Sequence, residues 1–329
     1  MKAELVRPAV DADLPQLLAL SESAAPAAGG EVLLVAQAAA PDEEPAALLG
    51  FLRLRQAIGM DLPRVWYHVG CTVHAAPELG LFHRQRTLML GHDHTGASEL
   101  ADITWARDDV ALSDQAATLQ LLVQTALLWI ACNRAQHAHR LITELSGPRD
   151  SIGQSPFWQG LGRHFFGGDP RAAASVHGPA WRTHVAALLP RHPVYTSFVP
   201  AAAQAPIAQV HPGALLLRDV LEQAGLRYSH HVNVEDAGPV LEATTDELAP
   251  RCRARRCTLA LALTPRQGGQ ACVVLATSAD AGVEGGWRAT RVLGQMLGTN
   301  LAVSGETLTR LGAEAGSRAW IAPLGADAG

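Results

Sequence analysis

The sequence contains a single lysine, Lys2, so arginine supplies nearly all of its positive charge. It also lacks any dense run of basic residues, and its 26 basic and 31 acidic residues give a formal net charge of -5. A protein that binds nucleic acid needs positive charge gathered on one surface to contact the phosphates. We therefore expect no nucleic-acid partner.

Cysteine and long apolar runs are scarce as well. The five cysteines form no Cys-x-x-Cys pair, and their odd number does not suggest a disulfide framework. The N-terminal stretch has no apolar core of the signal-peptide type, and the longest apolar run, LLVQTALLWIAC, is too short to span a bilayer. We expect a soluble protein of the reducing cytoplasm, with no membrane partner.

Apolar residues are abundant in short segments. The chain has 329 residues, of which 48% are hydrophobic and only 17% are charged. Such a composition is too weakly charged for a disordered chain and long enough for two domains, each with its own core. The sequence therefore predicts a compact globular protein.

The order of apolar patterns predicts a mixed sheet covered by helices, an α/β (α+β) fold. A strand that ends at Pro8 precedes a helix with Asp11 or Asp13 near its start. A long helix is expected over about 111–135, and Ser155 is expected to cap a short one. Further strands are predicted at 31–37, 48–56, 64–75, 84–93, 98–106 and 139–147. In the strand over 98–106, strict alternation is expected to mark one sheet face.

The C-terminal third has a different character. Residues 190–212 are proline-rich and predict a connection, followed by a helix that ends at Gly225 and one strand over 230–244. Beyond Cys257, short strands alternate with glycine-rich turns. We predict one domain over 1–250 and a small β-rich domain over 251–329.

The stretch LGHDHTGASELADITWARD, residues 90–108, raises the question of a metal site. His92 and His94 would share a face if they lay in a strand, but no third donor is in register, so the metal pattern is weak. A turn over residues 93–96 is favoured instead. Ser98 lacks the Gly-x-Ser-x-Gly elbow of a nucleophile. Glu99 could hold a cationic substrate group or form a surface ion pair.

His211 lies in a different setting, directly before Pro212. The proline disfavours helical dihedral angles at His211 and starts a helix, so the imidazole should lie at a fixed corner beside a helix N-terminus. The positive helix end would lower its pKa, which suits proton transfer near neutral pH. A histidine that merely caps or packs at a connection is the alternative.

Several stretches together resemble one family, the arginine N-succinyltransferases of bacterial arginine catabolism. They occur in the family's order over most of the chain, and the Ser-Pro-Phe-Trp and Gln-Val-His-Pro blocks are specific. The matching stretches are VRPAVDADLPQL, VGCTVHAAPELGL, DHTGASEL, SPFWQGLGRHFF, LLPRHPVYTSFVP, AQVHP and DAGPVLEA.

This resemblance implies a fold like that of the Gcn5-related N-acyltransferases, followed by a small β domain. It implies transfer of a succinyl group from succinyl-CoA to the α-amino group of L-arginine or a related amino acid, without a metal. It also implies a homo-oligomer or a hetero-oligomer with a paralogous subunit.

The resemblance also assigns roles to residues. Ile103 falls on the family's succinyl-CoA contact, in a strand that continues through Thr104 and Trp105, and His211 falls on its proposed proton donor. Backbone amides near Ile103 would polarise the thioester, and His211 would supply a proton to the leaving thiolate. The substrate guanidinium needs a carboxylate, for which we consider Glu99, Glu144 and Asp236.

The chain departs from the family at the expected diphosphate junction, ARDDVALSDQAA, which has no glycine. It carries Asp108, Asp109 and Asp114 where a helix N-terminus would otherwise attract the CoA diphosphate. The chain also lacks a segment after the first helix, and it has Ala237 where the family usually has glycine. A non-catalytic partner subunit with a degraded CoA site is therefore the alternative function, and metal-dependent hydrolysis with His92 and His94 is a third.

Overall fold

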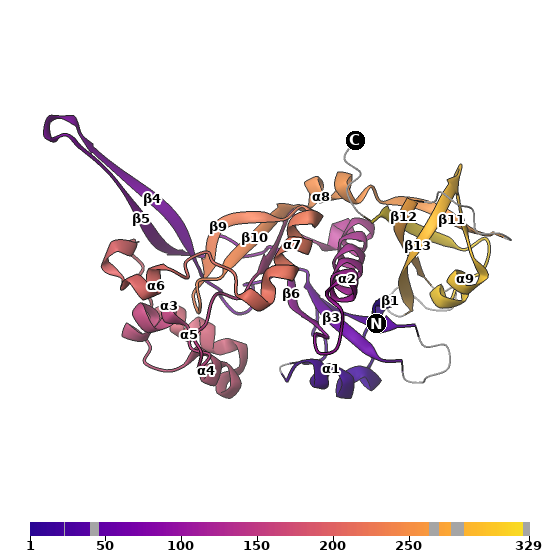
Figure 1. Ribbon diagram of the computed structural model, residues 1–329, viewed down its shortest axis with the longest axis horizontal. Coiled ribbons are helices and arrows are strands. Elements are labelled where there is room, and N and C mark those ends of the chain that lie inside the picture. Colours follow the sequence, from indigo (N-terminus) through magenta and orange to yellow (C-terminus); the bar gives the residue numbers. More distant parts are fainter. Residues whose placement is uncertain (23, 40–45, 263–269, 278–285, 325–329) are drawn as a thin grey trace.

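The computed structural model describes residues 1–22, 24–39, 46–262, 270–277 and 286–324. Within these residues fifteen strands join into one sheet, so the mixed α/β class expected from the sequence is confirmed. The molecule is elongated, with the hairpin of β4 (Trp66–Ala76) and β5 (Leu81–Gly91) projecting at one end and the C-terminal strands at the other (Figure 1).

The strands fall into two groups along the chain. Those of the first half are β1 (Ala3–Pro8), β2 (Glu31–Ala38), β3 (Leu48–Arg55), β4 (Trp66–Ala76), β5 (Leu81–Gly91), β6 (Ser98–Trp105) and β7 (Arg140–Glu144). Those of the second half are β8 (Val194–Tyr195), β9 (Arg227–Asn233), β10 (Pro239–Thr244), β11 (Arg255–Leu261), β12 (Gln270–Thr277), β13 (Trp287–Leu297), β14 (Asn300–Val303) and β15 (Arg318–Pro323).

The sheet order is β12-β15-β11-β14-β13-β1-β2-β3-β6-β7-β10-β9-β4-β5-β8. Neighbours in this order are antiparallel except for two pairs, β6 with β7 and β11 with β14. The helices are α1 (Leu14–Leu20), α2 (Leu112–Cys132), α3 (Pro156–Gly160), α4 (Pro170–His177), α5 (Trp181–Leu188), α6 (Ala201–Gln204), α7 (Leu215–Ala224), α8 (Thr245–Cys252) and α9 (Gly305–Leu311).

Helix α2 is the central helix of the largest core. Most of its apolar residues are buried, among them Leu119, Leu122 and Ala126, as the sequence pattern predicted. It packs against β1, α7 and α8. Among the described helices it alone is long and apolar enough to cross a membrane, but 61% of the relevant window is buried inside the protein. The apolar residues of α2 therefore form part of the core of the protein.

A second core lies under the base of the β4–β5 hairpin. Helix α3 begins as predicted, with the Ser155 hydroxyl accepting a hydrogen bond from the Trp158 amide at 3.0 Å. Phe157 and Trp158 then pack, fully buried, in one cluster with Tyr67 of β4 and residues of α5 and α6. These helices thereby cover the part of the sheet that β4, β5 and β9 form.

The segment over 230–244 corrects the prediction of one strand. It is an antiparallel pair, β9 and β10, in which Pro239 lies opposite Val232. The intervening turn carries Asp236, which accepts hydrogen bonds from the Gly238 amide and the Asn233 side chain. Asparagine, aspartate and glycine are typical turn residues, so they indicated a turn within this segment. The apolar residues on both sides of it suggested one continuous strand instead.

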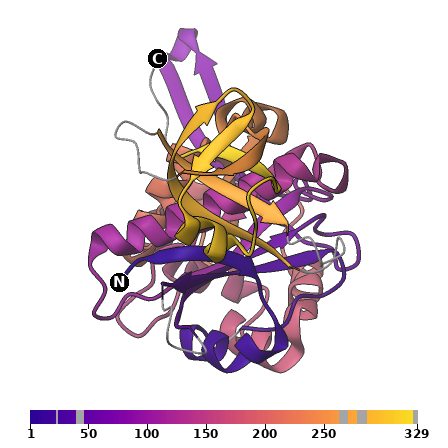
Figure 2. The ribbon, with the colours of Figure 1, turned by 90° about the vertical axis from the view of Figure 1, so that its right-hand side faces the viewer.

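The C-terminal strands close into a ring, because β12 pairs with both β13 and β15. Part of this ring has its own core, whereas Leu275, Trp287 and Ala289 belong to the core around α2. Strand β13 also pairs with β1, where Leu5 lies opposite Thr290. Figure 2 views the molecule from this end, with the C-terminal strands in yellow. A domain boundary near residue 250 stays a prediction.

Candidate active site

The two parallel strands β6 and β7 separate shortly after they meet. They pair only where Ser98 lies opposite Leu141 and Glu99 opposite Ile142. The Thr143 hydroxyl then donates to the Leu100 carbonyl at 2.8 Å, and the strands diverge. A cavity of about 330 Å³ lies in this opening, lined by residues 100–105 of β6 and 143–146 of β7 and the following loop. An extended ligand could bond to the edge of β6 there, as an added strand would.

A β-bulge shapes the wall of this cavity. Opposite β3, the pairing register shifts between Phe51 and Arg53, and Asp102 has a φ of 49°. The strict alternation expected for β6 is therefore wrong, because one extra residue re-aims the side chains that follow it. Arg53 stabilises the bulge by donating to the Asp102 carboxylate at 2.7 Å. Ile103, Thr104 and Trp105, the predicted acyl-CoA contacts, all line the cavity.

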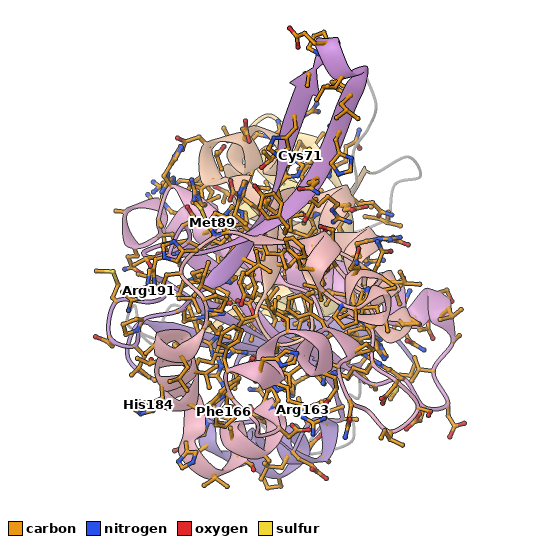
Figure 3. All side chains as sticks on the ribbon, turned by 90° about the vertical axis from the view of Figure 1, so that its left-hand side faces the viewer. Cys71, Met89, Arg163, Phe166, His184 and Arg191 are labelled. Atoms are coloured by element: carbon orange, nitrogen blue, oxygen red, sulfur yellow. The ribbon has the colours of Figure 1, made fainter. Side chains whose placement is uncertain are left out.

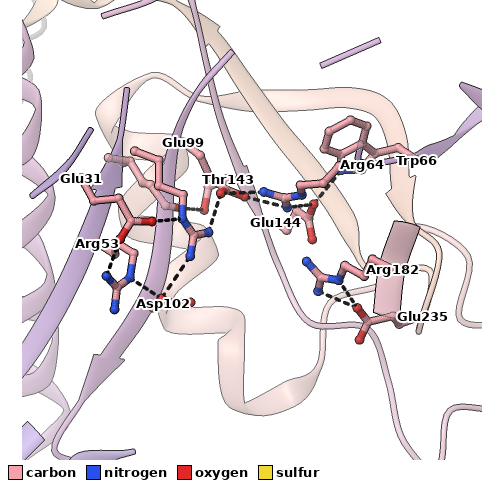
Figure 4. A network of polar contacts seen from close by, with 12 residues as sticks. Glu31, Arg53, Arg64, Trp66, Glu99, Asp102, Thr143, Glu144, Arg182 and Glu235 are labelled. Carbon is pink, nitrogen blue, oxygen red and sulfur yellow. Dashed lines mark hydrogen bonds and ion pairs between the residues drawn. The ribbon is translucent and has the colours of Figure 1, made fainter. Parts of the chain in front are cut away.

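Charged side chains dominate the rest of the lining. Three carboxylates were predicted as guanidinium ligands, and all three line this one cavity: Glu99, Glu144 and Asp236. Five arginines and a further glutamate lie beside them, which the sequence interpretation missed: Arg55, Arg64, Arg107, Arg149, Arg182 and Glu235. Most of these charges are paired with one another (Figure 4). The cavity is therefore polar but close to neutral.

Glu99 is the centre of the pairing. Its side chain is almost completely buried and accepts hydrogen bonds from Arg55 at 2.8 Å and from Arg64 at 2.8 and 2.9 Å. Burial alone would raise the pKa of Glu99, but the charges and hydrogen bonds of the two arginines outweigh it and lower the pKa. Glu99 thus forms a buried ion pair rather than a surface one, and it stays ionised.

Glu144 and Asp236 differ in what they can still bind. The Glu144 Oε1 atom accepts from Arg64 at 2.5 Å and from the Trp66 indole at 2.6 Å, while its Oε2 has no partner among the described residues. Asp236 is buried and already bonded to Arg149 and to its own turn. Of the predicted carboxylates, Glu144 is therefore the one with an oxygen available to a ligand.

Glu235 offers a second such oxygen. Its Oε1 accepts from Arg182 at 2.7 Å, and its Oε2 has no partner among the described residues. A small recess next to the cavity is lined by Glu144, Glu235, Arg64 and Arg182 together, so the two carboxylates face the same space. Two carboxylates can bond both sides of a planar guanidinium.

His211 lies beside this cavity, next to lining residues but not among them. Its amide donates to the carbonyl of Ser146, a lining residue, at 2.8 Å. Its Nδ1 atom accepts from the Gly213 amide at 3.0 Å. A neutral imidazole whose Nδ1 accepts a hydrogen bond must carry its proton on Nε2. His211 is therefore held as an Nε2–H donor. Its position, at the start of the turn that leads into α7, is the one that the His-Pro pair predicted.

The junction between β6 and α2 is closed by one side chain. Gln115 is buried, donates to the Val110 carbonyl at 2.8 Å and to the Arg107 carbonyl at 3.3 Å, and accepts from Trp105. Arg107 stacks over the Trp105 ring at 4.1 Å and approaches Gly213, next to His211. No carboxylate partner contacts Arg107 within the described residues. Arg107 is thus a cation without a carboxylate partner in the described structure, in a junction whose other charged residues are all aspartates.

His92 and His94 of the stretch 90–108 do not lie in a strand, in agreement with the turn that the sequence favoured. Strand β5 ends at Gly91, and residues 93–96 form the favoured turn. His94 is fully buried between Trp66 and His231, whereas exposed His92 bonds to the Arg64 carbonyl. Within the described residues, no group of three or more histidines, cysteines or acidic residues is arranged to hold a metal.

A cavity at the point where parallel strands diverge, with an unpaired strand edge and fixed charges, defines a binding site for an extended polar ligand in an α/β protein. The family model described as arginine N-succinyltransferase beta subunit matches residues 31–250. The chain belongs to this family.

Relatives and a solved structure agree with this membership. The arginine N-succinyltransferases of Salmonella paratyphi B (strain ATCC BAA-1250 / SPB7) and Salmonella newport (strain SL254) are each 36% identical over 211 residues, 63% of this chain. The match spans 59% of the length of those relatives. The arginine/ornithine succinyltransferase subunit AI from Pseudomonas aeruginosa has the same fold, with a TM-score of 0.78 and 24% identity over 99% of this chain and 100% of that one.

Proposed function

We propose that the protein is an N-acyltransferase that transfers the succinyl group of succinyl-CoA to the α-amino group of L-arginine. Family membership and the names of the relatives support this reaction. We also infer a Gcn5-related acyltransferase-like fold for residues 1–250, because strands β6 and β7 diverge beside a long helix. The observation that carries the proposal is the cavity in this opening, lined by the unpaired edge of β6.

Acyl-CoA would lie along β6. The pantetheine arm is an extended chain with amide groups, so it can bond to a free strand edge. The edge at Ile103, Thr104 and Trp105 would hold it, and a backbone amide would polarise the thioester carbonyl. Arg107 lies beyond Trp105 and has no carboxylate partner among the residues that the structure describes, so it would attract the phosphates.

The reaction requires two proton movements. The neutral α-amine attacks the thioester carbon, a carbon–nitrogen bond forms, and the carbon–sulfur bond breaks as the amine loses a proton. The proton that the attacking amine loses would pass to the departing thiolate, so the transfer balances. The Nε2–H of neutral His211 would donate a hydrogen bond to the sulfur as it leaves and so stabilise its negative charge. A hydrogen bond from Gly213 to Nδ1 keeps the ring in this orientation.

The acceptor guanidinium would bond to the unoccupied oxygens of Glu144 and Glu235. Glu99 would act indirectly, because it is enclosed by Arg55 and Arg64 and holds Arg64 against Glu144. Asp236 would likewise fix the adjacent turn. An acceptor with a cationic side chain, such as arginine or ornithine, fits this arrangement better than a neutral amino acid.

The test is release of free CoA thiol from succinyl-CoA by the purified protein, with L-arginine and L-ornithine as acceptors. We expect release above the uncatalysed rate with L-arginine. His211→Gln should lower kcat by about 10²–10³-fold, because the Nε2–H donor held at the leaving sulfur is lost. His164→Gln, a change in an exposed histidine, is the matched control. Release no faster than the uncatalysed reaction would overturn the proposal.

A non-catalytic partner subunit is the second candidate. It is favoured by the junction of β6 and α2, where Gln115 closes a loop without glycine and Asp108 and Asp109 stand near the helix start. Calorimetry with succinyl-CoA separates the two functions. Binding together with turnover supports the enzyme, whereas absence of both supports the partner subunit. In either case we propose a cytoplasmic oligomer, built from copies of this chain or with a paralogous subunit.

A further inference from the structure

A second cavity lies where the β4–β5 hairpin leaves the sheet, on a part of the molecule that the proposed reaction does not use. Its volume is about 330 Å³, and its lining comprises Val69, Gly70, Cys71, Arg84, Arg86, Tyr228 and His230. Figure 3 shows the hairpin from this end, with Cys71 labelled on it. Among the described strands, the hairpin pairs only with itself beyond its base, since β9 reaches no farther than His68 and β8 no farther than Thr87.

The charge of this cavity is positive and uncompensated. Arg84 and Arg86 lie two positions apart on β5, where Arg86 is opposite Cys71, so both face the same side of the hairpin. Neither guanidinium contacts a carboxylate within the described part of the chain, and no acidic residue lines the cavity. In the candidate active site, by contrast, Arg55, Arg64 and most other arginines are paired.

The opposite wall carries two further polar groups. The Tyr228 hydroxyl is buried without a hydrogen-bond partner among the described residues, which costs free energy unless something bonds to it. Burial raises the pKa of Tyr228, and the charge of nearby Arg86 opposes that rise, so the hydroxyl is a donor close to the guanidinium. The His230 ring lies 5.1 Å from the Tyr228 ring.

The backbone conformation that places His230 at this cavity is energetically unfavourable. The register between β9 and β10 shifts between Val240 and Leu241, which leaves Ser229 and His230 as the bulged residues. His230 has a φ of 60°, a conformation that residues other than glycine seldom adopt. Bulges that re-aim a side chain are common beside binding sites.

The geometry points to an anion-binding site at the base of the hairpin, for a small ligand with a carboxylate or phosphate group. The two guanidinium groups would bond to its oxygens, the Tyr228 hydroxyl would donate a further hydrogen bond, and His230 would close the outer side. The ligand would also remove the repulsion between Arg84 and Arg86.

Cys71 provides a test that reports on this cavity alone. It is exposed and lines the cavity, so a bound anion should slow its alkylation by iodoacetamide, measured by peptide mass spectrometry. The probes are inorganic phosphate and succinate, each compared with sodium chloride at equal ionic strength. At ten times its dissociation constant, the bound anion should slow alkylation about tenfold.

The double variant Arg84→Gln/Arg86→Gln should lose this protection, and Tyr228→Phe should weaken it. Because the arginines also affect thiol reactivity, the ratio of rates with and without the anion is compared within each variant. Arg163→Gln, which changes an exposed arginine far from the hairpin, should keep full protection. If the double variant fails to fold, Arg86→Gln alone serves in its place.

Protection by phosphate alone would identify a phosphate ligand, and protection by succinate alone would identify a carboxylate. The proposal is overturned if neither anion protects Cys71 beyond sodium chloride, or if the arginine variants are protected as well as the wild type. Turnover of succinyl-CoA plays no part in this measurement, so its result is independent of the proposed reaction.

Discussion

The buried carboxylate of Glu99 holds two arginines that would otherwise carry uncompensated charge into the protein interior. Glu99→Gln keeps the shape of the side chain but removes the charge that Arg55 and Arg64 neutralise. Breaking a buried ion pair on one side costs about 3–5 kcal/mol. We expect the free energy of unfolding to fall by about this amount, measured by urea denaturation followed through tryptophan fluorescence.

The matched control is Glu306→Gln in α9. Glu306 pairs with Arg310 one helical turn away, and its side chain is 80% exposed. Such surface pairs contribute about 0–1 kcal/mol. Equal losses in the two variants would contradict the structural role assigned to Glu99.

His94 should make the stability of the protein depend on pH. Burial, followed by the charges of His231 and Arg140, lowers the pKa of His94 to about 4, although Asp93 and Glu144 act in the opposite direction. The unfolded chain binds its proton near the ordinary value of 6.5. As the pH falls from 6.5 to 4, the unfolded state is therefore protonated first, and the free energy of unfolding decreases. Over this window the decrease from His94 should reach about 3 kcal/mol.

Urea denaturation at several pH values between 7 and 4 measures this dependence. His94→Phe should reduce the slope of the unfolding free energy against pH, because the titrating group is absent. His164→Phe, in which an exposed histidine is replaced, should keep the wild-type slope. A slope that His94→Phe leaves unchanged would show that His94 does not titrate as proposed. His137 is buried, and its pKa is lowered to about 4 as well, so part of the slope should remain.

At the scale of elements, the apolar pattern was sufficient to locate the central helix and two central strands, which are buried on most sides. It located α2 within a few residues, and it located β2 and β3. It could not reveal that Arg53 and Arg55 of β3 form ion pairs with residues of the site, because their partners Asp102 and Glu99 lie more than forty residues away. An arginine at alternate positions of an otherwise apolar strand was the available indication of a buried ion pair.

The candidate site was predictable only in part for the same reason. The residues taken from the family resemblance, Ile103 and His211, lie at the cavity that contains the predicted carboxylates or beside it. Glu235 was missed because its role depends on Arg182, which approaches from α5. Pairing between charges on distant elements is a property of the folded chain, and the sequence around Glu235 and Arg182 carries no local pattern that indicates it.

Two glycines allow the loops beside the cavity to cross. A side chain on Gly147 would collide with the backbone of Asp236, and one on Gly238 would collide with the Leu145 carbonyl. Gly147→Ala should therefore force apart the turn after β7 and the β9–β10 hairpin, at a cost of about 1–3 kcal/mol. Thermal unfolding should show a lower midpoint, and calorimetry should show weaker binding of succinyl-CoA.

Gly167→Ala is the control for this substitution. Gly167 has open space where a Cβ atom would lie, so the change should leave both the midpoint and the binding unaltered. A wild-type midpoint for Gly147→Ala would mean that the two loops can separate without loss, and the close crossing would have no structural importance.

At the scale of the whole molecule, the C-terminal ring and the rest of the protein share a core. Trp287 of β13 is buried and stacks on Trp129 of α2, with ring centroids 4.7 Å apart. Thr290 lies in the continuous pairing of β13 with β1, and Arg310 forms an ion pair with Glu4 at 2.8 Å. The predicted division near residue 250 would therefore cut through a shared core and a shared strand pairing, and we expect the two regions to fold together.

The point variant Trp287→Ala measures how strongly the two regions are coupled. Removal of a buried tryptophan costs about 3–5 kcal/mol. Leu293→Ala lies on the same strand but at a side chain that is 79% exposed, and it should change stability by no more than about 0.5 kcal/mol. If the ring unfolded independently, Trp287→Ala would split urea denaturation into two transitions, whereas shared folding predicts one transition at a lower midpoint.

A chain of residues 1–250 alone extends the same argument. Without the ring, the face of α2 that now meets Leu275, Trp287 and Ala289 would be exposed to water. Each large apolar side chain that loses its cover costs about 1.5–3 kcal/mol, and a folded domain has only about 5–15 kcal/mol in total. We therefore expect residues 1–250 to show no cooperative unfolding by circular dichroism and to aggregate. A cooperative transition near the wild-type midpoint would instead establish 1–250 as an independent domain, with the ring as an appended one.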